Sequence, residues 1–346
     1  MPAAINLSAY TSATPREDRK LKIRSSNFED DVEIDLDDAT LKARSHWSDY
    51  PVGVAVTLER AGYRLRGADL EINSEVPMGS GLSSSAAVEV STACALAANS
   101  GLDIDRQELA LLCQRAENEF VGARVGIMDQ FVALFGEERK ALMLDCRSLD
   151  YKLLPVPENV RLVVCNTMVK HELASNEYNE RRAQCEEGVK HLARFLPHVE
   201  ALRDVRLEDL EHYGRDLPEV IYRRCLHVIS ENARVLAAAE ALEQHDLQRF
   251  GQLMVESHVS LRDDYEVSSR ELNLMVELAV RAEGVYGARM TGGGFGGCTV
   301  NLVDAEHVNR FQRRIADGYE QITSWKPEIY VCEASKGAGP QKGTKE

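Results

Sequence analysis

The sequence predicts an α+β protein of two domains. The chain has 346 residues, and at about 150 residues per domain this length allows two. In the first half, short alternating strand patterns precede an alanine-rich helix, whereas the second half follows the order strand, helices, strand, strand, helix, strand. Pro155 and Pro157 separate the two patterns, because a proline cannot donate to a β-ladder. We therefore expect domains at residues 1–155 and 156–346.

Composition and charge narrow the classes of function. Apolar residues make up 44% of the chain and charged residues 28%, which is typical of globular proteins and excludes disordered or collagen-like chains. The net charge of −15 disfavours nucleic acid and anionic lipid as partners. Residues Met1–Lys20 lack a signal-peptide pattern, and no apolar run reaches the roughly 20 residues of a membrane span. We expect a cytoplasmic monomer that acts on small molecules.

Cysteines and histidines do not form a redox or metal motif in the sequence. No two of the eight cysteines make a CxxC pair, and most lie in apolar stretches, where cysteine behaves as a small core residue. His171, His227 and His258 are interpreted as structural, because the histidines form neither a catalytic triad nor a zinc pattern. The cysteines are Cys94, Cys113, Cys146, Cys165, Cys185, Cys225, Cys298 and Cys332.

The first domain is expected to begin with strands. Apolar and polar residues alternate at Leu21–Arg24 and Val32–Leu36, the pattern of half-buried strands. Asp103 or Asp105 is placed to cap a helix that runs to about Val121. The other elements expected here are a helix at 47–62, a strand at 68–76, a helix ending near 99, and strands at 141–145 and 151–154.

The second domain is expected to hold long helices between about Asn179 and Glu283, and the charged run at 179–187 is interpreted as a solvated helix face. The tail from Lys336 is polar and rich in glycine, so we expect it to fray. The other elements expected are strands at 161–166, 287–290, 298–303 and 328–332, and a helix at 306–319.

The clearest functional signal is the segment Pro77–Ala87, which follows a strand and opens a helix. We call its residues Gly79–Ser85 the glycine–serine loop. Gly79 and Gly81 let backbone amides approach an anion closely, and Ser83–Ser85 add hydroxyl donors at the start of a helix. The segment lacks the lysine of a Walker loop. We favour phosphate binding over the alternative, a turn with a serine cap, which explains only one glycine and one serine.

A second glycine-rich segment, Thr291–Gly297, lies between two predicted strands, and we call it the glycine loop. It has five glycines in the six residues from Gly292, whereas a tight hairpin needs one or two. The excess predicts a surface where backbone contacts a ligand.

Acidic residues near the middle of the chain are candidates for catalysis or metal binding. Asp129 lies in the apolar segment Gly126–Phe131, so it either caps a helix or has a functional partner. On the preceding helix, Glu117 and Glu119 fall on opposite margins of the apolar face at 100° per residue. Either glutamate could reach a metal, and the helical geometry does not choose between them.

Taken together, the segments Pro77–Ala87, Gly126–Gln130 and Thr291–Gly297 resemble the second motif, the catalytic-aspartate segment and the third motif of the GHMP small-molecule kinases. Within that superfamily, the chain resembles the galactokinases over nearly its whole length. Further matching stretches lie at 145–149, 175–187, 227–235 and 257–265.

The resemblance implies an N-terminal ribosomal-protein-S5-like domain that binds nucleotide and sugar, and a C-terminal ferredoxin-like α/β domain with inserted helices. It implies that Ser85 and Glu117 hold Mg²⁺. It also implies that the phosphates of ATP, the co-substrate, lie on Gly79, Ser80, Gly81, Leu82, Ser83, Ser84 and Ser85.

The same resemblance implies that Asp129 is the base for the anomeric hydroxyl of galactose and that Gly126, Asp129 and Tyr178 contact the sugar. The implied product is galactose 1-phosphate. The alternatives are a kinase for N-acetylgalactosamine or arabinose, and a non-catalytic sensor of sugar and nucleotide.

The family's first motif, which contains an arginine and a Glu-His-x-Asp sequence, belongs upstream of the segment matched by Pro2–Ile5. We expect it to be encoded before Met1, with the start codon assigned too far downstream. The alternative is a shortened chain with impaired activity.

Overall fold

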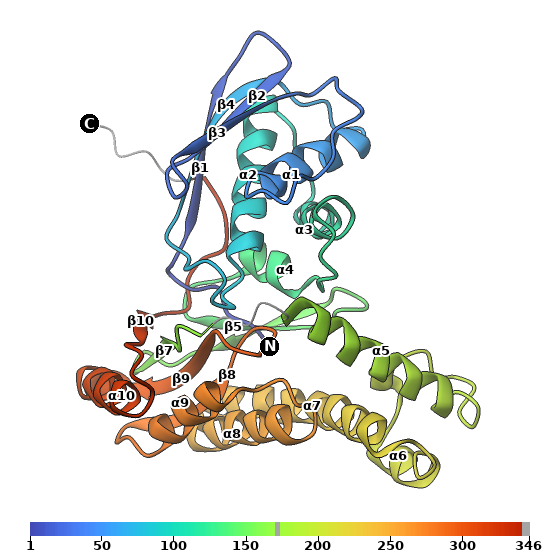
Figure 1. Ribbon diagram of the computed structural model, residues 1–346, viewed down its shortest axis with the longest axis vertical. Helices are drawn as coiled ribbons and strands as arrows, with labels where there is room; N and C mark the ends of the chain where they lie inside the picture. The colour runs from blue at the N-terminus through green and yellow to red at the C-terminus, as the bar shows by residue number, and fades with distance from the viewer. Residues whose placement is uncertain (170–173, 341–346) are drawn as a thin grey trace. The chain divides into compact units, whose positions relative to one another are not determined.

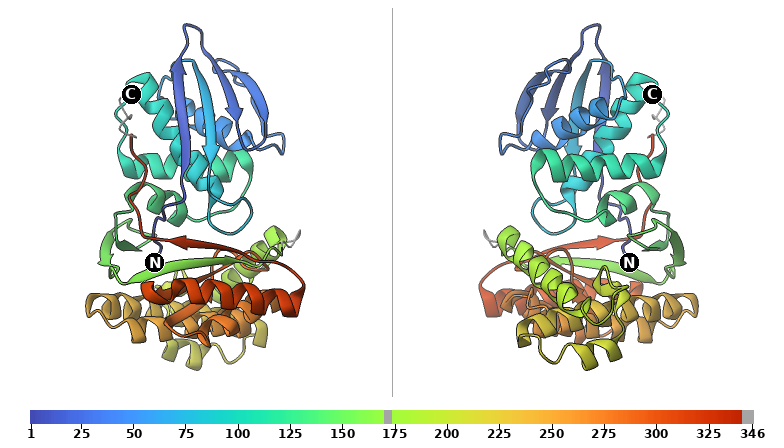
Figure 2. Two further views of the ribbon diagram at one scale, coloured as in Figure 1. Left: turned by 90° about the vertical axis from the view of Figure 1, so that its left-hand side faces the viewer. Right: turned by 90° about the vertical axis from the view of Figure 1, so that its right-hand side faces the viewer.

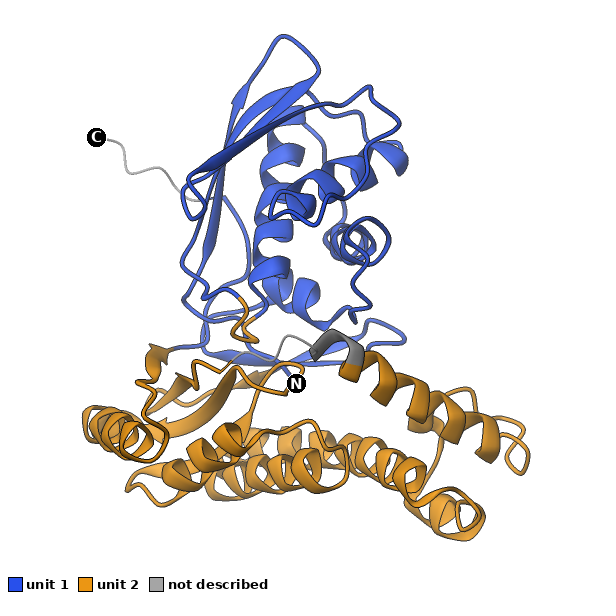
Figure 3. Ribbon diagram, in the orientation of Figure 1, with its two compact units in different colours: residues 1–78, 83–153, 333–346 blue, residues 79–82, 154–332 orange. Residues whose placement is uncertain are grey.

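The computed structural model describes residues 1–169 and 174–340 (Figure 1). The chain forms two compact units, coloured separately in Figure 3. Unit 1 contains residues 1–78, 83–153 and the segment from Glu333, and unit 2 contains residues 79–82 and 154–332.

The two units differ from the expected domains 1–155 and 156–346 at two places. The segment from Glu333 packs with unit 1, where the Ser335 amide donates to the Ala4 carbonyl and Ile5 forms a β-bridge with Ala334. Gly79–Leu82 groups with unit 2. Which ligand each domain binds stays a prediction.

Unit 1 contains a four-stranded sheet in the order β1-β4-β2-β3. Leu21 and Ile23 of β2 are fully buried, because alternate residues of a strand point to the same face. The predicted strands at 21–24, 32–36 and 68–76 are confirmed. The strands are β1 (Ala9–Pro15), β2 (Lys20–Ser25), β3 (Asp30–Asp35) and β4 (Ala68–Ser74).

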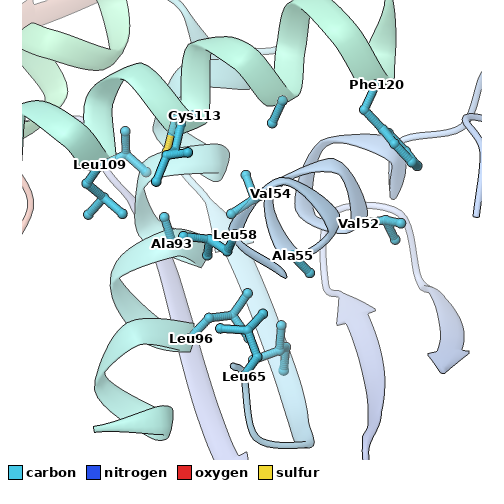
Figure 4. Packing of buried hydrophobic residues seen from close by; sticks show 14 of the residues in the cluster. Val52, Val54, Ala55, Leu58, Leu65, Ala93, Leu96, Leu109, Cys113 and Phe120 are labelled. Carbon is cyan, nitrogen blue, oxygen red and sulfur yellow. The ribbon is translucent and has the colours of Figure 1, made fainter. Parts of the chain in front are cut away.

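Helices cover one face of this sheet (Figures 1 and 2). Figure 4 shows Val54 and Leu58 of α1 directed towards Ala93 and Leu96 of α2, with Leu109 of α3 nearby. The helices are α1 (Asp49–Arg60), α2 (Ser84–Ser100), α3 (Arg106–Arg115) and α4 (Met128–Phe135), and a hairpin follows of β5 (Lys140–Leu144) and β6 (Tyr151–Pro155).

Unit 2 contains a second four-stranded sheet, in the order β10-β7-β9-β8, in which all neighbours are antiparallel. Its strands are β7 (Val160–Asn166), β8 (Val285–Met290), β9 (Cys298–Asp304) and β10 (Glu328–Cys332). Helices α8, α9 and α10 pack against these strands. The predicted α+β class and the inserted helices are therefore confirmed. The helices are α5 (Ala174–Leu192), α6 (Leu207–Tyr213), α7 (Glu219–Glu243), α8 (Leu247–Asp263), α9 (Arg270–Val280) and α10 (Val308–Thr323).

The predicted fraying of the tail is wrong at its first residues. The amides of Gly337 and Ala338 donate to the carbonyls of Gly136 and Ala133 at 2.8 and 2.6 Å, and Arg106 Nη2 donates to the Ala338 carbonyl at 2.9 Å. These bonds hold residues 337–338 on unit 1 although the tail as a whole is polar and rich in glycine.

The predicted core role of the cysteines holds for five of the eight, which are buried. Within residues 1–169 and 174–340, no helix has both the length and the apolar character needed to cross a bilayer.

Helix α8 lies unusually close to β8, because Gly251 and Gly287 meet backbone to backbone. A Cβ at Gly251 would overlap the carbonyl oxygen of Tyr286. We expect Gly251→Ala to destabilise the protein by about 3 kcal/mol, since overpacking forces backbone shifts. Urea unfolding measures this change. The matched control is Gly339→Ala, whose Cβ would have no neighbour within 4 Å. Equal unfolding midpoints for the two variants would contradict the prediction.

Candidate active site

The glycine–serine loop passes from unit 2 to unit 1 between Leu82 and Ser83. Ser83 adopts a left-handed conformation, with φ of 59°, and its hydroxyl donates to Asp129 Oδ2 at 2.5 Å. Within the described chain, this hydroxyl makes no capping bond to α2. Ser83 thus occupies the N-cap position of α2 without capping the helix through its side chain, so capping does not explain this serine. Among the residues that the structure describes, the N-cap side chain gives the first amides of α2 no cap, an arrangement that suits an anion.

Asp129 lies in the first turn of α4, where Ile127 occupies the N-cap position. Asp129 is thus not the cap of this helix, which removes the structural alternative for its carboxylate. Burial raises the pKa of Asp129, while the hydrogen bond from Ser83 lowers it. The result is a partly desolvated carboxylate with one fixed hydroxyl partner.

A π-helical turn at Ala116–Val121 decides between the two glutamates. Glu117 is buried, whereas the side chain of Glu119 is 68% exposed and faces Arg115. A π-turn adds a residue to the helical repeat, so the spacing of 100° per residue does not apply here. Glu117 is therefore the inward acidic residue, and the Ser85 hydroxyl partly offsets the rise that burial causes in its pKa.

Glu89 and Gln130 complete this cluster, and the sequence analysis missed both. Gln130 is fully buried, and its Nε2 donates to Glu117 Oε2 at 2.7 Å and to Glu89 Oε2 at 3.1 Å. Burial and the charge of Glu117 raise the pKa of Glu89 to about 9. Burial also raises the pKa of Glu117. The sequence signal that could have indicated Glu89 is its position on the alanine-rich helix, one turn after Ser85.

The donor set of this cluster fits a divalent cation. The Ser85 hydroxyl and the Glu117 carboxylate are oxygen ligands, which Mg²⁺ prefers. In the described ranges, Glu89 Oε1 and Gln130 Oε1 are buried without a hydrogen-bond partner. Those ranges hold no group of three or more His, Cys, Asp or Glu residues that would cage a metal. Mg²⁺ bound through one or two protein ligands takes its remaining ligands from phosphates and water.

The loop before Asp129 is fixed by Asn118, another residue that the sequence analysis did not single out. The Asn118 side chain accepts from the Val125 amide at 2.8 Å and donates to the Val125 carbonyl at 3.2 Å. The adjacent Gly126 is exposed, and a Cβ there would meet no atom within 4 Å. The backbone at Gly126 is thus both held in place and open to a ligand.

The glycine loop of unit 2 differs in part from its prediction. A Cβ at Gly292 would lie 2.9 Å from the Cα of Gly81, and one at Gly297 would lie 2.7 Å from the Ser80 carbonyl oxygen. These glycines therefore allow close packing of protein backbone rather than contact with a ligand. Gly293 has open space around its Cβ position and remains the candidate for ligand contact.

The predicted site residues fall into two sets. Unit 1 contains Ser83, Ser84, Ser85, Glu117, Gly126 and Asp129, and unit 2 contains Gly79, Ser80, Gly81, Leu82 and Tyr178. Tyr178 lies on α5 and is 40% exposed, as a ligand-contacting tyrosine requires.

Two of the three histidines have the predicted structural role. His227 stacks on Tyr265 and hydrogen-bonds to the hydroxyl of Ser260. His258 Nδ1 accepts from the Met290 amide at 3.3 Å. His171 lies outside the described residues.

The fold and these residues define a small-molecule kinase of the GHMP class. The family models for the N-terminal and C-terminal domains of GHMP kinases match residues 49–137 and 238–321. Solved mevalonate kinases share the fold, one with a TM-score of 0.64 at 17% identity.

Similar curated proteins show which family within this class the chain belongs to. The chain is 49% identical to a galactokinase of Chloroflexus aurantiacus over 336 residues, which cover 97% of this chain and 86% of that protein. It is 41% identical to a galactokinase of Halalkalibacterium halodurans over 99% of this chain and 87% of that protein. The solved Lactococcus lactis galactokinase complexed with galactose matches with a TM-score of 0.93 and 37% identity, over 97% of this chain and 88% of that one. The chain belongs to the galactokinase family.

Proposed function

We propose that the protein transfers the γ-phosphoryl group of ATP to the anomeric hydroxyl of galactose and so forms galactose 1-phosphate. The observation that carries this proposal within the structure is the hydrogen bond between Ser83 and Asp129. This bond holds the Asp129 carboxylate beside the N-terminal end of α2, which supports its proposed role as proton acceptor. Galactokinase relatives at 41–49% identity support galactose as the acceptor.

The start of α2 is the proposed phosphate site. Amides at a helix N-terminus point outwards and carry a partial positive charge. The glycine–serine loop leads into this helix, and the chain's charge of −15 makes such local donors necessary for binding a triphosphate. Phosphoryl transfer depends on in-line positioning and on stabilisation of charge at the transferred group.

Asp129 is the proposed base. It accepts the proton of the anomeric hydroxyl as that oxygen attacks the γ-phosphorus. Burial raises the pKa of this carboxylate, which makes it a stronger proton acceptor, and the Ser83 hydroxyl orients it. Gly126 and Tyr178 are the proposed neighbours of the sugar.

Ser85 and Glu117 are the proposed ligands of Mg²⁺. When bound, the ion neutralises charge on the phosphate oxygens. Gln130 holds one oxygen of Glu117, and the Ser85 hydroxyl acts on the same carboxylate by lowering its pKa. The protein thus fixes the orientation of its acidic ligand before substrates arrive.

One chain supplies every residue of the proposed site, so we expect activity in a monomer. The use of ATP fits a cytoplasmic enzyme. Light scattering of the active protein would measure its mass, and activity confined to a larger assembly would contradict the monomer.

A panel of sugars tests the proposed reaction. ADP release is followed with galactose, N-acetylgalactosamine, arabinose and glucose, both for the 346-residue chain and for a version extended in frame upstream of Met1. We expect the highest kcat/KM with galactose. A higher value with another sugar would reassign the substrate. Calorimetric binding of ATP and galactose without ADP release from either version would favour a sensor.

A further inference from the structure

Arg181 is a buried exception on a solvated helix face. The charged run at 179–187 is mostly exposed or half-buried, as the sequence predicts, but Arg181 is 8% exposed. Buried arginines are normally paired with a close carboxylate. The carboxylates of Glu177 and Glu180 are no closer than 3.8 and 3.9 Å to Arg181 Nη1. The main partners of the guanidinium lie elsewhere.

Those partners are backbone carbonyls of the segment between α8 and α9. Arg181 Nε donates to the Tyr265 carbonyl at 2.8 Å, and Nη2 donates to the Glu266 carbonyl at 3.0 Å. A planar guanidinium can make both bonds at once, which a lysine cannot reproduce. Arg181 therefore fixes α5 to residues 265–266 with defined geometry.

The same segment also holds the glycine loop. The Phe295 amide donates to the Val267 carbonyl at 2.7 Å, and the guanidinium of Arg181 lies 5.8 Å from the centroid of the Phe295 ring. Phe295 has φ of 60°, a left-handed conformation that costs a bulky residue free energy unless its surroundings hold it. Arg181 and Val267 hold this residue from two sides.

Tyr178 lies three residues before Arg181 on α5, so the two side chains occupy neighbouring positions on one face of the helix. The contacts that fix Arg181 therefore also fix the helical turn that carries Tyr178. Arg181, Tyr178, Phe295 and the 265–267 segment all belong to unit 2.

We propose that Arg181 is a positioning residue that joins the sugar-contacting turn of α5 to the glycine loop, so that one guanidinium supports the binding of both substrates. The inference rests on the proposed function for the roles of Tyr178 and of the glycine–serine loop, against whose Gly81 the glycine loop packs at Gly292. Its physical core, the support of Phe295 by Arg181, does not depend on those roles.

The test compares Arg181→Met with Arg182→Met. Methionine keeps an apolar stem but has no N–H donors and no charge. Arg182 is the matched control because it is the next residue on α5, its side chain is 53% exposed, and it pairs with the exposed Glu186. Calorimetry measures the affinities for galactose and for ATP separately.

We expect Arg181→Met to weaken both affinities by about tenfold, the effect of losing charged hydrogen bonds. We expect Arg182→Met to match the wild type and Tyr178→Phe to weaken galactose binding alone. A loss confined to one ligand, or no loss, would overturn the proposal.

Hydrogen exchange provides a readout without ligand. We expect the Phe295 amide to exchange faster in Arg181→Met than in Arg182→Met, and equal rates would overturn the proposal. If Arg181→Met does not fold, Arg181→Lys replaces it, with a smaller change expected in the same direction. If the unsubstituted protein binds neither substrate, faster exchange in Arg181→Met would still uphold the Phe295 contact, but the substrate role of Arg181 would be overturned and the proposed function contradicted.

Discussion

Asp129→Ala and Asp129→Asn are each expected to lower kcat by about 10³-fold, the scale of a lost general base. Affinity for ATP is expected to stay within about twofold, because the carboxylate acts on the acceptor and not on the nucleotide. Asparagine keeps an oxygen that can accept from Ser83, the partner at 2.5 Å, but it cannot take the proton. Single-turnover kinetics measures the rate, and calorimetry measures the nucleotide affinity.

The control for this prediction is Glu119→Ala, which removes an acidic side chain that is 68% exposed in the same unit. Its kcat should equal that of the wild type. A tenfold loss of ATP affinity in the Asp129 variants would show that the carboxylate acts at the nucleotide. Retained turnover in Asp129→Asn would exclude it as the base.

Gly81→Val is expected to weaken ATP binding by about tenfold or more. Gly81 has φ of +81°, and a Cβ there would lie 3.3 Å from the Thr291 carbonyl oxygen. A β-branched residue is strained at positive φ, so the glycine–serine loop has to move away from its neighbour. Calorimetry with ATP and Mg²⁺ measures the effect.

Gly62→Val is the control that adds backbone strain at positive φ without crowding the glycine–serine loop. Gly62 has φ of +95° with no atom within 4 Å of its Cβ position, so the substitution strains a distant turn without crowding. It should lose stability but keep its ATP affinity. If Gly81→Val also keeps its ATP affinity, the loop is not the phosphate site.

Local sequence patterns predicted most strands because burial follows a two-residue period. Leu21 and Ile23 alternate with charged residues, and the structure buries both fully. β1 (Ala9–Pro15) was not predicted, because its small and polar residues do not alternate with apolar ones. Its pairing with β4, 53–65 residues along the chain, depends on a partner that a local pattern does not contain.

The acidic cluster also shows where prediction from local sequence patterns fails. Local helical geometry could not choose Glu117 over Glu119, because it assumed an α-helix where the chain forms a π-turn. The bonds from Gln130 to Glu117 and Glu89 join residues 13 and 41 positions apart. Burial in this cluster and the charge of Glu117 raise the pKa of Glu89, whereas the bond from Gln130 lowers it. These effects depend on tertiary contacts that a local pattern does not contain.

The glycine loop was identified correctly as unusual, but its cause was partly misjudged. Sequence alone registers the entropic cost of five clustered glycines. It does not distinguish backbone packed against a ligand from backbone packed against protein. The approach of Gly292 to Gly81 and of Gly297 to Ser80 supplies the second explanation.

The proposed placement of both substrates around α2 and Asp129 is tested most directly by a crystal structure with a non-hydrolysable ATP analogue, Mg²⁺ and galactose. The account predicts phosphate oxygens within hydrogen-bonding distance of the Ser84 and Ser85 amides, and the anomeric hydroxyl of the sugar on Asp129. Phosphates bound away from the start of α2, or a sugar whose anomeric hydroxyl does not reach Asp129, would contradict it.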